Sequence, residues 1–275
     1  MAAVAVAGVA SAQVTITGKL GFGVRDGTLS NKEIVTTDGA VTFSASEDLG
    51  GGMSAAVSMT IESYGDGAAS TNVNAGGATL DVKTANAGSL SFFSTGAAAH
   101  DLAVGSMSYG TNDVLGGTTN DYTALQYNLP TLVDGLSIGV RWAAVDTVAT
   151  AGLDKQFRFG YNLAGAALTF NTKSTSTGTA SSAGLTYDIA GVMVKAVVDT
   201  SVQTGESKKN EYSISMPVGG LTLAASKMTK GTTISSTEVG ATLAMSKRTS
   251  VTFGMGSFEG GTTKSANRLR LVHTF

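Results

Sequence analysis

The sequence predicts an all-β fold, a closed antiparallel transmembrane β-barrel of about 16 strands. Segments of about ten residues alternate apolar and polar side chains, which is the weak signature of a strand that crosses a membrane. Charged residues make up only 14% of the 275 residues, against roughly 25% in soluble domains. Glycine is abundant at 36 residues and proline scarce at 2, which favours strands and turns over helices.

Residues 1–12 are expected to be the remnant of a signal peptide, and residues 13–275 to form the barrel. The start, "MAAVAVAGVASAQVT", places Ala10 and Ala12 after an apolar segment and before Gln13. This is the A-x-A pattern of a signal-peptidase site, so the mature chain is expected to begin at Gln13. The basic region that usually opens such a peptide is missing, and a short apolar strand of a cytosolic protein remains the alternative.

The first barrel strand, "VTITGKLGFGVR", shows the alternation clearly. Side chains point to opposite faces of a strand in turn, so one face is apolar and suits lipid. That face carries Val14, Ile16, Leu20, Phe22 and Val24. The other face suits water and carries Thr15, Thr17, Lys19, Gly21, Gly23 and Arg25.

Fifteen further segments continue the pattern and complete an even number of strands, as in bacterial outer-membrane barrels. No stretch approaches the roughly 18 consecutive apolar residues of a membrane-spanning helix. The expected strands after the first are 41–47, 53–62, 78–84, 89–95, 122–129, 135–144, 155–163, 166–173, 181–189, 192–199, 209–216, 221–227, 238–246, 251–258 and 267–275.

Short connections are expected to alternate with longer ones along the chain. Tight turns such as "DLGGG", "LAG" and "PVGG" suit one rim of a membrane barrel, and longer loops suit the other. A soluble sandwich gives no reason for this asymmetry. The longest connection, 96–121, exceeds the usual length of a loop without function.

The last segment, "NRLRLVHTF", is a strand with two different faces. Leu269, Leu271, His273 and Phe275 share the apolar face, and Arg268 and Arg270 lie on the other. An even strand count brings this segment beside the first strand. Pairing between the two would close the barrel and remove both sheet edges.

These stretches resemble the general diffusion porins of Gram-negative bacteria, in particular the proteobacterial sixteen-stranded porins. The matching segments cover most of residues 13–275. They are "VTITGKLGFGV", "FSASEDLGGGMSAAVSM", "YTALQYNLPTLVDGLSIGVRWA", "LAMSKRTSVTFGMG" and the ending "RLRLVHTF".

The resemblance implies a water-filled channel of the cell outer membrane through which ions and small hydrophilic solutes diffuse passively. It also implies a homotrimer surrounded by outer-membrane lipid, without a cofactor. A third extracellular loop would fold into the lumen and form a constriction, and 96–121 falls at its position. The barrel assembly machinery would recognise the aromatic Phe275 as an assembly signal. The chain is shorter than many members, and its loop carries few acids, namely Asp101, Asp113 and Asp121.

Basic side chains on the water-facing sides of the strands raise the question of ion selectivity. If Val14 pairs with Phe275, Lys19 lies opposite Arg270, with Arg268 one step higher on the same face. Like charges directly opposite are normally destabilising. Across the barrel, Arg141 and Arg158 are expected on neighbouring strands at comparable height. Two interpretations stay open: a basic constriction wall that favours anions, or residues that pair with the loop aspartates in an unselective pore.

Enzymatic chemistry finds little support in the residues. Cysteine is absent, and the two histidines are His100 in the long loop and His273 on the apolar face. No metalloprotease, CxxC or P-loop motif occurs, and "GFGVRDG" lies inside an alternating strand rather than before a helix. The net charge of -2 gives no basic surface for nucleic acid.

The single Trp142 is expected at the membrane interface, in an aromatic girdle with Phe22, Tyr122 and Phe157, rather than in a ligand site.

The alternative function is a secreted structural or adhesive β-protein, such as a solenoid, suggested by the Gly, Ser and Thr content. A solenoid would show a fixed repeat period, and the segments vary in length instead.

Overall fold

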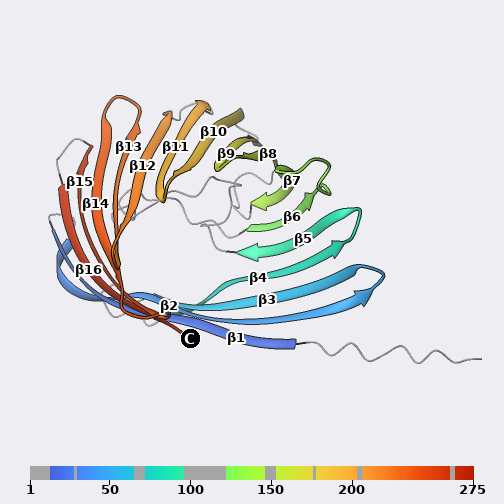
Figure 1. Cartoon of the computed structure of the whole chain (residues 1–275), viewed down its shortest axis with the longest axis horizontal. Coiled ribbons are helices and arrows are strands. Elements are labelled where there is room, and N and C mark those ends of the chain that lie inside the picture. Colours follow the sequence, from blue (N-terminus) through green and yellow to red (C-terminus); the bar gives the residue numbers. More distant parts are fainter. Residues whose placement is uncertain are drawn as a thin grey trace, which may run out of the picture.

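The computed structural model describes residues 13–27, 30–64, 72–95, 122–145, 153–175, 178–202, 207–260 and 264–275. Within these ranges sixteen antiparallel strands follow one another and close into a barrel (Figure 1). Each strand pairs with its neighbours in sequence, and β1 pairs with β16. The predicted fold class is therefore confirmed. No helix among the described residues is long and apolar enough to span a membrane.

The strands overlap every segment expected from the alternation. Their bounds are β1 Gln13–Gly27, β2 Ser30–Gly50, β3 Met53–Tyr64, β4 Asn72–Thr84, β5 Gly88–Thr95, β6 Tyr122–Asn128, β7 Leu136–Val145 and β8 Leu153–Leu163. The second half comprises β9 Ala166–Thr175, β10 Gly178–Ile189, β11 Val192–Ser201, β12 Lys209–Val218, β13 Leu221–Lys230, β14 Ile234–Ala244, β15 Thr249–Glu259 and β16 Lys264–Thr274.

The prediction that short and long connections strictly alternate is wrong in part. Short turns do occupy one rim, and we call it the short-turn rim. At the other rim, however, only residues 28–29 separate β1 from β2, and only residues 176–177 separate β9 from β10. The reason is that several hairpins continue their ladders beyond the apolar segment. The longest strand, β2, has 21 residues.

Two of the short turns have the geometry that suits a tight β-hairpin. Ala164 and Gly165 join β8 to β9 with φ values of 47° and 83°, and Ala190 and Gly191 join β10 to β11 with 53° and 87°. Positive φ at both central positions is the property of a type I′ turn, whose twist matches that of the flanking strands. These turns therefore fix the register of the hairpins that they connect.

Backbone and side-chain contacts close the seam between β1 and β16. Gly18 N donates to Phe275 O at 3.0 Å, and Phe275 N donates to Gly18 O at 2.9 Å. A Cβ atom added to Gly18 would lie 2.3 Å from Phe275 Cζ, so the aromatic ring covers the space above this glycine. The seam thus places Phe275 on the same face as Leu20 and Phe22.

The predicted signal-peptide remnant, residues 1–12, lies outside the described residues, as does the predicted lumen loop 96–121.

Candidate functional site

The two faces of the sheet differ in polarity and in exposure. On β7 and β8, Arg141 is 8% exposed and Gln156 5%, whereas the neighbouring Trp142 is 36% exposed and Phe157 37%. Side chains on the inside of a closed barrel converge and cover one another, so the covered face is the inner one. The inner wall is therefore polar and the outer wall apolar, as the alternation predicts.

Hydroxyl side chains form cross-strand pairs along the inner wall. Such pairs satisfy each other's polar groups without filling the lumen with bulk. They join Thr42 to Thr60 at 2.9 Å, Ser58 to Thr79 at 2.7 Å and Thr242 to Thr252 at 3.1 Å.

Arg141 on β7 is held against the inner wall by a neutral neighbour. Its Nε donates to Gln126 Oε1 at 3.0 Å, and its Nη2 donates to the same oxygen at 2.7 Å. On its other side, the register places Gln156 opposite. The guanidinium keeps its full charge at any physiological pH, so this part of the wall is positive.

Arg158 on β8 belongs to the same patch. Its cross-strand neighbours are Gly139 on β7 and Asn171 on β9. Since Arg141 pairs with Gln156, Arg158 lies diagonally from Arg141, two residues along β8. The expectation that both arginines are on neighbouring strands at comparable height therefore holds, with one diagonal step between them.

Arg268 and Arg270 form a second basic pair on β16. Arg270 lies between Gly23 and Thr252, and Arg268 lies between Arg25 and Gly254 in the register. β16 and β8 are eight positions apart in the ring of sixteen strands, so the two arginine pairs are on opposite walls. Arg141 is the sixth of the ten residues of β7 and Arg158 the sixth of the eleven of β8. Arg268 and Arg270 are the fifth and seventh of the eleven residues of β16, so both pairs lie near the middle of their strands.

The predicted register between the first and last strands is wrong. Lys19 pairs with Thr274 rather than with Arg270, because Phe275 pairs with Gly18 instead of Val14. The ladder is displaced by four residues from the expected pairing. A displacement by an even number leaves every side chain on its predicted face, so Lys19 still faces inward but does not join the arginine pair. The repulsion expected between Lys19 and Arg270 is thus absent.

Acids on the strands themselves are the functional residues that the sequence reasoning missed. Asp81 accepts a hydrogen bond from Ser91 Oγ on the inner wall. Asp154 Oδ2 lies 3.7 Å from Lys173 Nζ, and Glu211 forms an ion pair with Lys209. The alternation already placed these acids on the water-facing side, so the same rule that found the arginines could have found them. The loop acids Asp101, Asp113 and Asp121 lie outside the described residues.

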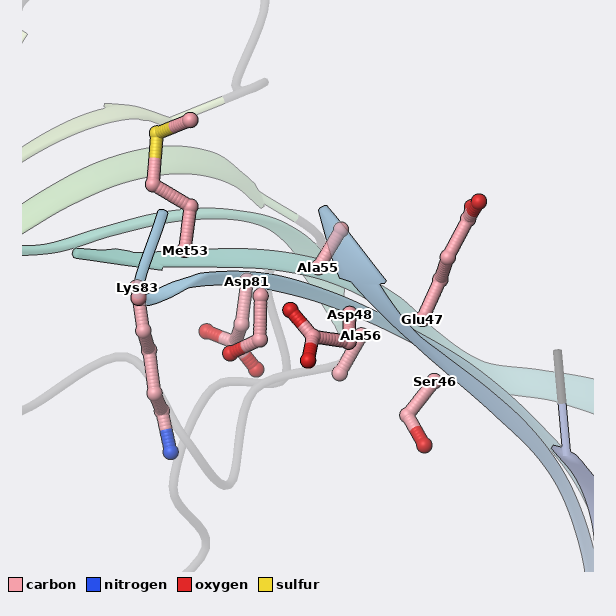
Figure 2. Close-up of a pocket in the computed structure, with 10 residues that line it drawn as sticks. Ser46, Glu47, Asp48, Met53, Ala55, Ala56, Asp81 and Lys83 are labelled. Carbon is pink, nitrogen blue, oxygen red and sulfur yellow. The ribbon is translucent and has the colours of Figure 1, made fainter. Parts of the chain in front are cut away.

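A hollow of about 580 Å³ opens on β2, β3 and β4 beside the short-turn rim. Figure 2 shows the side chains of Asp48, Asp81 and Lys83 on one side of the sheet, and those of Glu47 and Met53 on the other. Asp48 also accepts a hydrogen bond from Gly50 N at 2.8 Å within the turn. The hollow is therefore part of the polar inner wall, with charges of both signs.

The described residues show no arrangement of side chains for binding a metal ion. Within these ranges no group of three His, Asp or Glu side chains is arranged to hold a metal ion. His273 Nδ1 lies 2.9 Å from Thr249 Oγ1 near the short-turn rim, and His273 is exposed. "GFGVRDG" is part of β1, with Gly21 and Gly23 buried on the inner face.

A family model described as Gram-negative porin matches residues 1–271. The chain belongs to the Gram-negative porin family. Its sixteen-strand barrel and polar inner wall agree with that membership, and they contradict the alternative of a secreted solenoid. No curated protein matches the sequence significantly.

Solved porin structures share the fold at low sequence identity. A mutant of the Rhodobacter blastica porin superposes with a TM-score of 0.73 at 11% identity, covering 96% of this chain and 100% of that one. A loop-deletion mutant of OmpT, an outer membrane protein of Vibrio cholerae, gives a TM-score of 0.71 at 13% identity, with 96% and 99% covered. At such identities the likeness concerns the fold.

The family and the barrel together establish the general activity. This porin is an outer-membrane channel for the passive diffusion of ions and small hydrophilic solutes. Family and fold point to a channel rather than to an enzyme.

Proposed function

We propose that this porin favours anions, and that the two opposite arginine pairs are the basic wall of its constriction. One observation carries the proposal: none of the cross-strand neighbours of Arg141, Arg158, Arg268 and Arg270 is an acid. Those neighbours are Gln126, Gln156, Gly139, Asn171, Arg25, Gly254, Gly23 and Thr252.

The acids of the described wall support the same conclusion. Asp154 has Lys173 as an ion-pair partner, and Glu211 has Lys209. Part of the negative charge is thus offset locally by lysines, whereas no residue directly opposite the four arginines in the register carries a negative charge. Rings of fixed charge bias ion passage, and a narrow aqueous lumen with low-dielectric walls focuses their field. Lys19 adds a positive charge on the inner face of β1.

Reversal potentials in a salt gradient across a planar bilayer test this proposal. The native channel should favour chloride over potassium, and replacing Arg268 and Arg270 together by Gln should move the reversal potential toward zero. Lys227→Gln is the matched control, because Lys227 is exposed on the outer face and its charge should not affect the permeating ions. A native preference for potassium would overturn the proposal.

We further propose that three copies of the chain assemble into a trimer and that the barrel assembly machinery recognises Phe275. The trimer is the assembly that the resemblance implies. Conductance steps arriving in threes, together with cross-linked species of three chains in detergent, are the expected results. Independent single steps from a monomer of defined mass would contradict the proposed trimer.

The loop acids Asp101, Asp113 and Asp121 are proposed to line the constriction from the lumen side, and paired Asp→Asn changes should strengthen the anion preference.

A further inference from the structure

The methionines of the barrel lie on two different faces. Met59 follows Ser58 on β3, whose hydroxyl group belongs to an inner-wall pair, so Met59 points outward. Met255 on β15 also points outward, because Thr252, three residues before it, belongs to another inner-wall pair. The two methionines are 50% and 43% exposed. They share the apolar outer face, so the surroundings to which they are exposed are lipid.

Met193 on β11 points the other way, into the lumen. It lies opposite Ser215 on β12. Ser215 is four residues after Glu211, which forms its ion pair with Lys209 on the inner wall. An even number of residues keeps a side chain on the same face of a strand, so Ser215 and its partner Met193 also face inward. Met193 is nevertheless 38% exposed.

The other methionines of the described strands do not combine these two properties. Met228 on β13 also faces inward, opposite Glu211, but it is only 5% exposed. Met216 follows the inward Ser215 and therefore points outward, and Figure 2 shows Met53 on the outer side of the sheet. Within the strands that the structure describes, Met193 is thus the methionine that presents an exposed thioether to the lumen.

The surroundings of Met193 on the inner wall are polar. Its cross-strand neighbours are Asp188 on β10 and Ser215 on β12, and the next inward residue along β11 is Lys195. Such side chains hold water beside the thioether rather than excluding it. Small hydrophilic solutes that diffuse through the channel therefore reach the sulfur atom of Met193 from the aqueous side.

We propose that Met193 is an oxidation site on the inner wall, where peroxides that pass through the channel convert its thioether into a sulfoxide. The peroxide O–O bond breaks and an S–O bond forms. The second peroxide oxygen leaves as water after taking up the remaining protons. The sulfur loses two electrons and the peroxide gains them. The product is uncharged, but it replaces a flexible apolar side chain by a polar one that accepts hydrogen bonds.

The outward methionines are protected from the same reaction although they are more exposed. Hydrogen peroxide must leave water to reach them, and it finds no hydrogen-bond partners among acyl chains. Its concentration there should be at least about thirtyfold lower than in water, the ratio that corresponds to about 2 kcal/mol for the transfer of one polar group. The barrel thus separates its methionines by face rather than by exposed area.

Peptide mass spectrometry of the porin in lipid vesicles, sampled over time in hydrogen peroxide, tests the proposal. Met193 should gain one oxygen atom at least about thirtyfold faster than Met59 and Met255, and Met228 should also react slowly because it is covered. In the unfolded chain in guanidinium chloride all four should react at similar rates, which shows that their intrinsic reactivity is equal. Equal rates for Met193 and Met59 in the folded porin would overturn the proposal.

Two neighbouring positions on β12 provide a matched pair of variants. Ser213→Met places a new thioether on the inner face, and Ile214→Met places one on the outer face. Ile214 is 46% exposed and Ser213 is only half-buried, so exposed area alone would make the methionine at 214 react faster. Access through the lumen gives the reverse order, and faster oxidation at 214 would contradict the proposal. Conductance shows that each variant is folded, and because peroxide and sulfoxide are uncharged the result does not depend on the ion preference of the pore.

Discussion

Adding a single methyl group at Gly18 should loosen the seam that closes the barrel. The new Cβ atom would lie 2.3 Å from Phe275 Cζ, 2.7 Å from Phe275 Cε2 and 2.8 Å from Ala40 O. Carbon atoms in favourable contact stand about 3.5 to 4.0 Å apart, so the ring must move by more than 1 Å or β1 must shift against β2. Overpacking of this kind costs about 1 to 3 kcal/mol.

The expected cost depends on Phe275, which makes a double-mutant cycle the appropriate design. When Phe275→Ala removes the ring, Gly18→Ala should cost less, although the contact of the new Cβ with the backbone oxygen of Ala40 at 2.8 Å remains. Alanine also suits a strand better than glycine by about 0.5 to 1 kcal/mol. The interaction between the two sites should therefore be about 1 to 2 kcal/mol, well above the scatter of about 0.5 kcal/mol for independent positions.

Denaturant-induced unfolding in lipid vesicles, followed by the fluorescence of the single Trp142, measures the cycle. Gly220→Ala is a control for inserting a methyl group without a clash, because the atom nearest its added Cβ, Leu243 Cδ1, lies 3.8 Å away and Gly220 is not among the glycines with positive φ. Additive effects of Gly18→Ala and Phe275→Ala would refute the reasoning, since they would mean that the ring does not occupy the space above Gly18.

Three further predictions concern other parts of the barrel. Deleting Phe275 should reduce the amount of folded porin in the outer membrane, as measured by its heat-dependent mobility in detergent gels. Unchanged assembly would mean that the pairing of Phe275 with Gly18 is not needed to close the barrel. Trp142 fluorescence should be quenched more by lipids brominated near the headgroup than by those brominated near the chain ends, whereas quenching by water-soluble agents alone would place the ring outside the lipid. Gly135→Ala should lower the free energy of unfolding by about 1 to 3 kcal/mol more than Gly51→Ala. Both glycines have positive φ, 80° and 62°, but only at Gly135 would the added Cβ lie close to another atom, 2.2 Å from Asn162 O. Equal costs of the two substitutions would contradict this prediction.

The alternation of side chains was sufficient to predict the strands and their faces, because lipid on one side and water on the other impose it along each crossing. The predicted strand bounds were wrong where a strand extends beyond the region with lipid on one side and water on the other. The strand expected at 41–47 runs from Ser30 to Gly50, and its first part includes Lys32 and Glu33, which belong to a polar segment without an apolar face. Backbone hydrogen bonding continues there although the hydrophobic pattern does not.

The register of the strands and the pairing of charged residues could not be predicted from the sequence for a different reason. A period of two fixes the face of each residue, but a slip by two or four residues preserves every face. The pairing of Gly18 with Phe275 depends on the fit of a ring over a residue without a side chain, which no hydrophobic pattern encodes. For the same reason the arginines were predicted on the correct face, while the partner predicted for Arg270 was wrong.

The opposite placement of the two arginine pairs has a consequence for solutes without net charge. Like charges on facing walls exert sideways forces that oppose one another near the barrel axis, so these four arginines contribute little torque on a dipolar molecule that passes there. A pore with unlike charges on facing walls would instead turn each dipole across the channel. The four arginines therefore add little orienting force on zwitterions and sugars that cross near the barrel axis.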